Sequence, residues 1–173
     1  MKTGKGEKIV AVQWDGSRLL NTIILNEQKV AEFYRAIASN ADPKGSALFF
    51  EKLAQDEERH ESIYKALLEQ MEGKTMLELE EDDAEYMDLL LRFNITDSFD
   101  EIMKDSEKIK GRTQIYDLAE RVERDAVFFV SELMRLYPDL APEQMGIILK
   151  EEKKHLQMIL QRQRDFASAP GGM

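Results

Sequence analysis

The two histidines of this chain each follow a glutamate by three positions, in Glu57-x-x-His60 and in Glu152-x-x-His155. On an α-helix, positions i and i+3 project from the same side, so each pair can offer one carboxylate and one imidazole to the same metal ion. The chain has no other histidine. Because both histidines obey one spacing, the pattern indicates two metal-binding pairs rather than an accident of composition.

One further glutamate precedes each pair by about thirty residues and lies within an apolar helical stripe. These glutamates, Glu27 and Glu123, are 96 residues apart, and the two histidines are 95 residues apart, so the chain contains an internal repeat. A lone carboxylate on an apolar face is costly to bury, whereas two divalent ions balance four carboxylates. The repeat therefore predicts a dinuclear centre held by Glu27, Glu57, His60, Glu123, Glu152 and His155.

Four carboxylates and two imidazoles make an oxygen-rich ligand set. Such a set suits iron or manganese, and zinc can also bind it. Six ligands over two ions leave positions open for oxygen or peroxide. The chain has no cysteine, which excludes thiolate zinc sites, iron–sulfur clusters and disulfides. We expect two iron ions as the cofactor, with manganese or zinc as alternatives.

Apolar periodicity near 3.6 residues predicts four long helices that must position these ligands. Two helical hairpins joined by one long crossover form a known four-helix bundle topology, so we expect one all-α domain over residues 1–173. Residues 9–14 alternate weakly and suit a short extended arm. The expected long helices are residues 17–40, 43–71, 113–136 and 142–166. The crossover is residues 74–112, with short helices beginning at residues 81 and 98, and a loose tail follows at residues 167–173.

The composition excludes several classes of protein. A formal net charge of -10 argues against binding to a phosphate backbone, so we expect no nucleic-acid partner. No stretch approaches the roughly 18–20 apolar residues of a membrane span. The basic residues 1–8 are not followed by the apolar core of a signal peptide. We therefore expect a cytoplasmic protein without a membrane partner.

Four segments resemble the metal-ligand helices of the rubrerythrin-like branch of the ferritin-like superfamily. They surround the ligands predicted above, and the resemblance covers roughly residues 17–166. It implies a ferritin-like bundle with a di-iron carboxylate centre, commonly dimeric, that oxidises Fe(II) and reduces peroxide or oxygen. The quoted segments are Asn26-Glu-Gln-Lys-Val-Ala-Glu-Phe-Tyr34, Leu53-Ala-Gln-Asp-Glu-Glu-Arg-His60, Val122-Glu-Arg-Asp-Ala-Val-Phe-Phe129 and Leu149-Lys-Glu-Glu-Lys-Lys-His155.

The chain departs from rubrerythrin in two respects. Without cysteine it has no Cys-ligated rubredoxin domain, so an external electron donor is expected. Rubrerythrin also carries an extra glutamate three residues after its third-helix ligand, where this chain has Ala126. A shifted register would make Glu120 the ligand and Glu123 the extra carboxylate. We favour Glu123, because Ala126 and Phe129 downstream of it fit the family pattern better.

Tyr34 lies seven residues after Glu27 on the same helical face. It either hydrogen-bonds a ligand carboxylate or supplies an electron, or it is a core tyrosine with a satisfied hydroxyl. The leading functional hypothesis is a di-iron oxidoreductase of peroxidase or ferroxidase type. The alternatives are iron storage or sequestration, a dimanganese catalase, and a bundle in which the metal is only structural.

Overall fold

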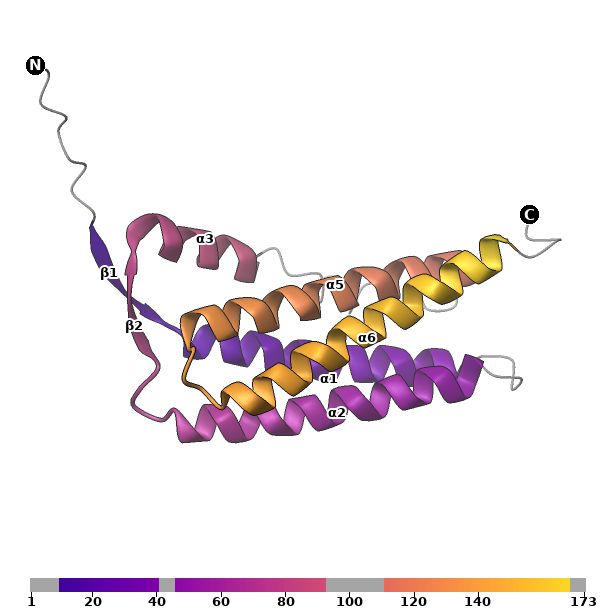
Figure 1. The fold of residues 1–173 in the computed structure, drawn as a ribbon, viewed down its shortest axis with the longest axis horizontal. Helices are drawn as coiled ribbons and strands as arrows, with labels where there is room; N and C mark the ends of the chain where they lie inside the picture. The colour runs from indigo at the N-terminus through magenta and orange to yellow at the C-terminus, as the bar shows by residue number, and fades with distance from the viewer. Residues whose placement is uncertain (1–9, 41–45, 93–110, 169–173) are drawn as a thin grey trace, which may run out of the picture.

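The computed structural model describes residues 10–40, 46–92 and 111–168. Four long helices run side by side along the longest axis of the molecule (Figure 1). Apolar residues recur on one side of each helix, and packing these sides together buries them. The four helices are α1 (Ser17–Asn40), α2 (Ser46–Gln70), α5 (Arg112–Leu136) and α6 (Pro142–Ala167).

The observed helix ends lie close to the expected ones. Helix α1 has the predicted bounds, α5 begins one residue earlier than predicted and α6 ends one residue later. Helix α2 ends at Gln70 rather than 71, and its expected start at residue 43 lies outside the described residues. Pro142 occupies the first turn of α6, where its missing N–H costs no helical hydrogen bond.

The crossover between the hairpins contains a strand as well as the predicted helix. Strand β1 (Ala11–Asp15) pairs antiparallel with β2 (Met76–Glu80), and Trp14 lies opposite Leu77. Helix α3 (Glu81–Arg92) follows directly, with three acidic residues in its first turn. The sequence-based view of the crossover as helical was therefore incomplete. The expected helix from residue 98 lies outside the described residues.

The small sheet is fastened to the bundle near the start of α1. The Gly16 N–H donates to the carbonyl of Thr75 at 2.9 Å, and the Tyr137 hydroxyl donates to the same carbonyl at 2.6 Å. A Cβ on Gly16 would lie 1.6 Å from the Tyr137 oxygen, so only glycine fits here. The sheet is also linked to α3, because the indole N–H of Trp14 in β1 donates to Asp88 of α3 at 2.9 Å.

Two apolar clusters fill the bundle, one on each side of a polar layer. The first lies toward the sheet and α3 and includes Trp14, Leu19, Leu20, Ile23, Leu67, Met87, Leu133 and Ile148. The second lies toward the other end of the helices and includes Phe33, Tyr34, Phe50, Leu53, Tyr116, Ala119 and Ile159. The layer between them contains the buried glutamates and histidines, so two packed cores hold those side chains in place.

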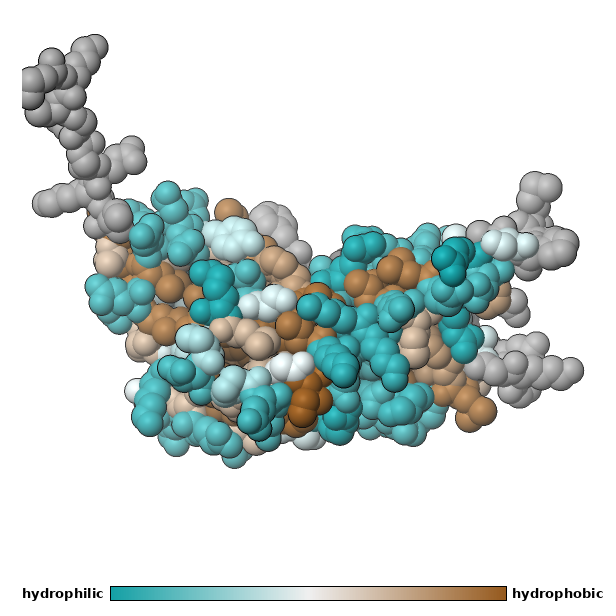
Figure 2. Space-filling model, viewed as in Figure 1, coloured by the Kyte–Doolittle hydropathy of each residue, from teal (hydrophilic) through white to brown (hydrophobic). Residues whose placement is uncertain are grey.

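The face shown in Figure 2 is largely hydrophilic, with apolar patches near the end that carries the sheet and α3 and smaller ones in the middle and toward the other end. Among the described residues, no helix has the length and apolar character that a membrane span requires.

Candidate metal centre

The structure brings all six predicted ligands into one buried layer. Each of them is at most 4% exposed. Their donor atoms form two groups, each with ligand atoms within 4.8 Å of one another. The first group is Glu27, Glu57, His60 and Glu152, and the second is Glu57, Glu123, Glu152 and His155. Glu57 and Glu152 belong to both groups, which is the arrangement that two neighbouring ions with shared carboxylates require.

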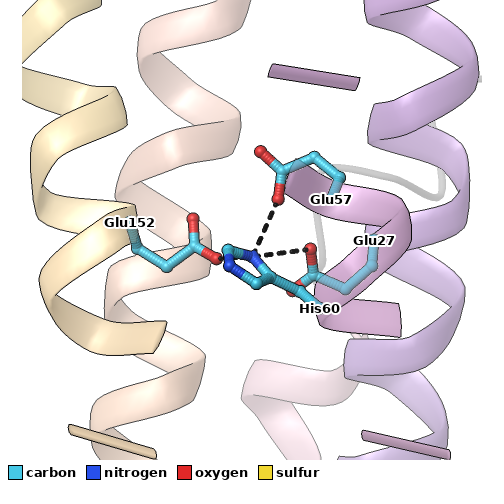
Figure 3. Close-up of side chains that lie close together, drawn as sticks. All are labelled: Glu27, Glu57, His60 and Glu152. Carbon is cyan, nitrogen blue, oxygen red and sulfur yellow. Dashed lines mark hydrogen bonds and ion pairs between the residues drawn. The ribbon is translucent and has the colours of Figure 1, made fainter. Parts of the chain in front are cut away.

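Each helix contributes in the way that its sequence spacing predicts. Helices α2 and α6 each supply a Glu-x-x-His pair, and α1 and α5 each supply one glutamate. Figure 3 shows the first group, in which Glu27 from α1, Glu57 and His60 from α2, and Glu152 from α6 point toward one another. The four helices therefore hold the ligands around a common centre.

The Nδ1 atom of His60 faces the carboxylates of the first group. It lies 2.6 Å from Glu152 Oε1, 3.2 Å from Glu57 Oε2 and 3.9 Å from Glu27 Oε2. The Nδ1 atom of His155 faces the second group in the same way, 3.2 Å from Glu57 Oε1 and 3.6 Å from Glu123 Oε2. Both histidines thus direct the same ring nitrogen toward the centre.

Several buried atoms of this layer have no hydrogen-bond partner. They are Glu57 Oε1, Glu123 Oε2, both carboxylate oxygens of Glu152, and His155 Nδ1. Buried polar atoms are normally paired, since an unpaired one costs about 1–3 kcal/mol. These atoms converge on common points without hydrogen-bond geometry between them, and they are oxygen and imidazole donors. The layer therefore fits a pair of metal ions.

Burial and mutual repulsion favour protonation of the two single glutamates. Removal from water raises the pKa of Glu27 well above its ordinary value, and the charges of Glu152 and Glu57 raise it further. Removal from water likewise raises the pKa of Glu123, together with the charge of Glu57. In the metal-free chain these two carboxyls hold protons more tightly than exposed glutamates do.

The neighbouring carboxylates raise the pKa values of both histidines. Burial lowers the pKa of His60, but the adjoining carboxylates of Glu152 and Glu57 outweigh it and raise the pKa to about 10. Burial also opposes the charge on His155, and the nearby Glu152 and Glu57 raise its pKa to about 12. Burial acts to raise the pKa of Glu57, yet the two histidines hold it well below its usual range.

These shifts favour protonation of four of the six clustered groups when no metal is bound. Protonation of Glu27, Glu123, His60 and His155 adds four positive charges to the fully deprotonated set, as two divalent ions would. Metal ligands must be deprotonated, so ions entering the layer displace these protons. Protons and metal ions therefore compete for the same buried positions.

Two further carboxylates hold the outer nitrogens of the histidines. His60 Nε2 lies 3.0 Å from Glu151 of α6, and His155 Nε2 lies 3.4 Å from Asp56 of α2. Such outer partners fix the orientation and tautomer of a metal-bound imidazole. Arg59 links the two, 3.2 Å from Asp56 and 3.0 Å from Glu151. Sequence reasoning missed this feature, although an acidic residue precedes the glutamate of both Glu-x-x-His pairs.

The two buried tyrosines near the layer differ in their hydroxyl contacts. The Tyr34 hydroxyl donates to Glu123 Oε1, which agrees with the hypothesis that Tyr34 hydrogen-bonds a ligand carboxylate. Tyr64 is also fully buried, but its hydroxyl has no hydrogen-bond partner. Tyr34 therefore orients a carboxylate of the layer, and Tyr64 makes no comparable contact.

Glu120 belongs to neither group of clustered ligands. Its carboxylate instead accepts a hydrogen bond from Arg124 Nε at 2.9 Å on the outer side of α5, and this contact lowers its pKa. Glu123 is the carboxylate of α5 that lies in the buried layer, with 1% exposure. The position of Glu120 outside the buried layer therefore contradicts the alternative in which Glu120, rather than Glu123, is the main ligand from α5.

Known proteins agree with this geometry. A family model for rubrerythrin matches residues 19–162, a segment that contains all six clustered ligands. A solved structure from Thermotoga maritima, described as a ferritin-like diiron-carboxylate protein, matches with a TM-score of 0.69 at 22% identity, over 88% of this chain and 96% of that chain. At that identity the likeness concerns the fold, and it confirms a ferritin-like helical bundle. No curated protein matches the chain. The chain belongs to the rubrerythrin family.

Proposed function

We propose that this chain is a di-iron oxidoreductase that couples the oxidation of Fe(II) to the reduction of peroxide or oxygen. The observation that carries the proposal is the pair of buried ligand groups that share Glu57 and Glu152. Membership of the rubrerythrin family supports it. The protein from Thermotoga maritima with the same fold is described as a diiron-carboxylate protein, which supports it further.

The proposed roles of the residues follow from their positions. Glu57 and Glu152 belong to both groups and would be shared by the two ions, Glu27 and His60 would complete one site, and Glu123 and His155 would complete the other. Two bound Fe(II) ions would supply the two electrons that, with two protons, convert hydrogen peroxide into two water molecules.

Residues outside the ligand set position the ligands. Tyr34 holds Glu123 through its hydroxyl, and Asp56 and Glu151 hold the outer nitrogens of the histidines. None of these three residues belongs to either group of clustered ligands, so we assign them a positioning role. Such outer contacts would fix the orientation of the imidazoles and of the Glu123 carboxylate when metal is bound.

The native metal and the partners belong to the proposal as well. The oxygen-rich ligands suit iron and also manganese, which would make a dimanganese catalase the alternative. Because the chain has no cysteine, electrons for repeated turnover would come from an external donor. Dimerisation stays a prediction, which sedimentation velocity would check.

The test is a single-turnover reaction of protein that has been loaded with Fe(II) under anaerobic conditions. Protein loaded with Fe(II) is mixed with hydrogen peroxide or, separately, with dissolved oxygen, and iron oxidation is followed optically. We expect oxidation much faster than that of the same concentration of free Fe(II). A rate equal to that of free Fe(II) would contradict the proposal, and catalase activity found only with manganese would favour the alternative.

A further inference from the structure

A pocket between α1 and α5 reaches the buried ligand layer. Its inner end is formed by Glu27, Glu57 and Glu123, each at most 4% exposed. Other lining residues, Asn26 and Ala126, are only partly buried. The pocket therefore leads from the partly exposed surface of α1 and α5 to three of the clustered carboxylates.

The pocket is narrow. It leaves about 20 Å³ for the centre of a water molecule, and roughly 10–15 Å³ of such space suffices for one water. Four of its wall residues are large and apolar, namely Ile23, Val30, Val122 and Phe129, and besides the three glutamates the polar lining residues are Asn26 and Asp125. The apolar side chains offer few hydrogen bonds to a larger polar ligand. The space thus suits a ligand of two or three heavy atoms that finds its polar contacts at the inner end.

The opposite side of the layer is occupied by side chains. There the imidazoles of His60 and His155 contact Glu151 and Asp56, and Arg59 links these two carboxylates. A ligand arriving from that side would have to break the contacts that hold the imidazoles. The side of α1 and α5 contributes only one carboxylate from each helix and contains the pocket.

Two lining residues occupy equivalent positions in the internal repeat. Val30 follows Glu27 by three residues, and Ala126 follows Glu123 by three residues. They line the same pocket from opposite helices. Ala126 has the smaller side chain and is partly exposed, whereas Val30 is larger and buried. The pocket is therefore wider on the side of Ala126 than on the side of Val30.

We propose that this pocket is the entry port for a small oxidant, and that Ala126 sets its size limit. The port admits ligands of two or three heavy atoms, such as hydrogen peroxide or dioxygen, and excludes alkyl hydroperoxides. This inference rests on the proposed function, because it assumes metal ions at the inner end. It adds a size limit on the oxidant and a specificity-determining residue to that function.

The test uses azide, a ligand of three heavy atoms, on protein loaded with Co(II), which gives an optical readout without turnover. Metal content is measured first for the full-length chain and for each variant. In Ala126→Leu, three added carbons enter the narrow pocket, so we expect azide affinity to fall at least tenfold at unchanged metal content. Val127→Leu adds bulk at the neighbouring, non-lining position of α5 and should bind azide as the unaltered chain does.

A second variant keeps the test decisive if Ala126→Leu does not fold or load metal. Val30→Ala widens the same pocket, so we expect it to raise the affinity for acetate, a bulkier probe, relative to azide. Unchanged azide affinity in a metal-loaded Ala126→Leu, or an unchanged acetate-to-azide ratio in Val30→Ala, would overturn the port. Failure of the unaltered chain to bind metal would instead contradict the proposed function.

Discussion

The two sides of the ligand layer differ in what they contribute. The side formed by α2 and α6 supplies both histidines, both shared glutamates and the carboxylates that hold the imidazoles. The side formed by α1 and α5 supplies Glu27 and Glu123 and contains the narrow pocket. One side is built to fix the ions, and the other leaves a path to them.

The comparison teaches that a repeated motif need not give equal sides. The internal repeat relates α1 to α5 and α2 to α6, so each side is made of two equivalent helices. Each helix of one side, α2 or α6, carries a Glu-x-x-His pair, whereas each helix of the other side, α1 or α5, carries a single ligand glutamate. The following experiments would break or sharpen this contrast, beginning with the largest expected effect.

Removal of a shared ligand should cost more metal than removal of an unshared one. Glu57→Ala leaves neither group complete, so we expect bound metal to fall from about two ions per chain to near zero. Glu27→Ala leaves the group around His155 intact and should retain about one ion. Metal analysis after gel filtration measures both. Two ions retained in Glu57→Ala would show that Glu57 is not shared.

Metal binding should release protons from the histidine side of the layer, the side formed by α2 and α6. The raised pKa values of His60, about 10, and His155, about 12, keep both imidazoles protonated at neutral pH without metal. Ions expel at least these two protons, so binding strengthens as pH rises. Between pH 6 and 8 we expect the product of the two binding constants to rise at least about 100-fold per pH unit, and more steeply if Glu27 and Glu123 also release protons. Calorimetry in buffers of different ionisation enthalpy counts the protons, and a count of zero would contradict the protonated layer.

Asp56 and Glu151 should affect metal affinity only through the histidines that they contact. Asp56→Asn weakens the contact to His155, so we expect metal affinity to fall about 10- to 100-fold. Glu58→Gln is the matched control, because Glu58 is exposed on α2 and pairs with Arg35 at 2.5 Å. Competition with a chelator gives both affinities. Equal affinities in the two variants would remove Asp56 from the account.

The smallest effect should distinguish the two buried tyrosines. Tyr34→Phe removes the donor to Glu123 and should lower the unfolding free energy of the metal-free protein by about 1–2 kcal/mol. Tyr64→Phe removes a hydroxyl that has no partner, so stability should stay the same or rise. Urea denaturation measures both. A larger loss in Tyr64→Phe would mean that its hydroxyl has a role that the described contacts do not explain.

Local periodicity explains why the helices and the clustered residues could be predicted. The spacing of Glu57 and His60 places both on one helical side, and the repeat carries the same arrangement to Glu152 and His155. The ends of α1, α5 and α6 fell within one residue of expectation because apolar periodicity marks long helices well. That these residues bind metal stays a prediction.

Features that depend on distant pairing could not be predicted in the same way. Strand β2 has only five alternating residues, and its partner β1 is more than sixty residues away in the chain. Asp56 and Glu151 each contact a histidine on the other hairpin, and a helix rich in acidic residues does not reveal which one will do so. The pocket beside Ala126 exists only once α1 and α5 are packed.

The most direct measurement is anomalous X-ray diffraction at the iron absorption edge, on crystals of the iron-loaded chain. The account predicts two iron positions within the four helices, one beside Glu27 and His60 and the other beside Glu123 and His155, with Glu57 and Glu152 between them. A single iron position, or iron bound only at surface carboxylates, would contradict the dinuclear centre.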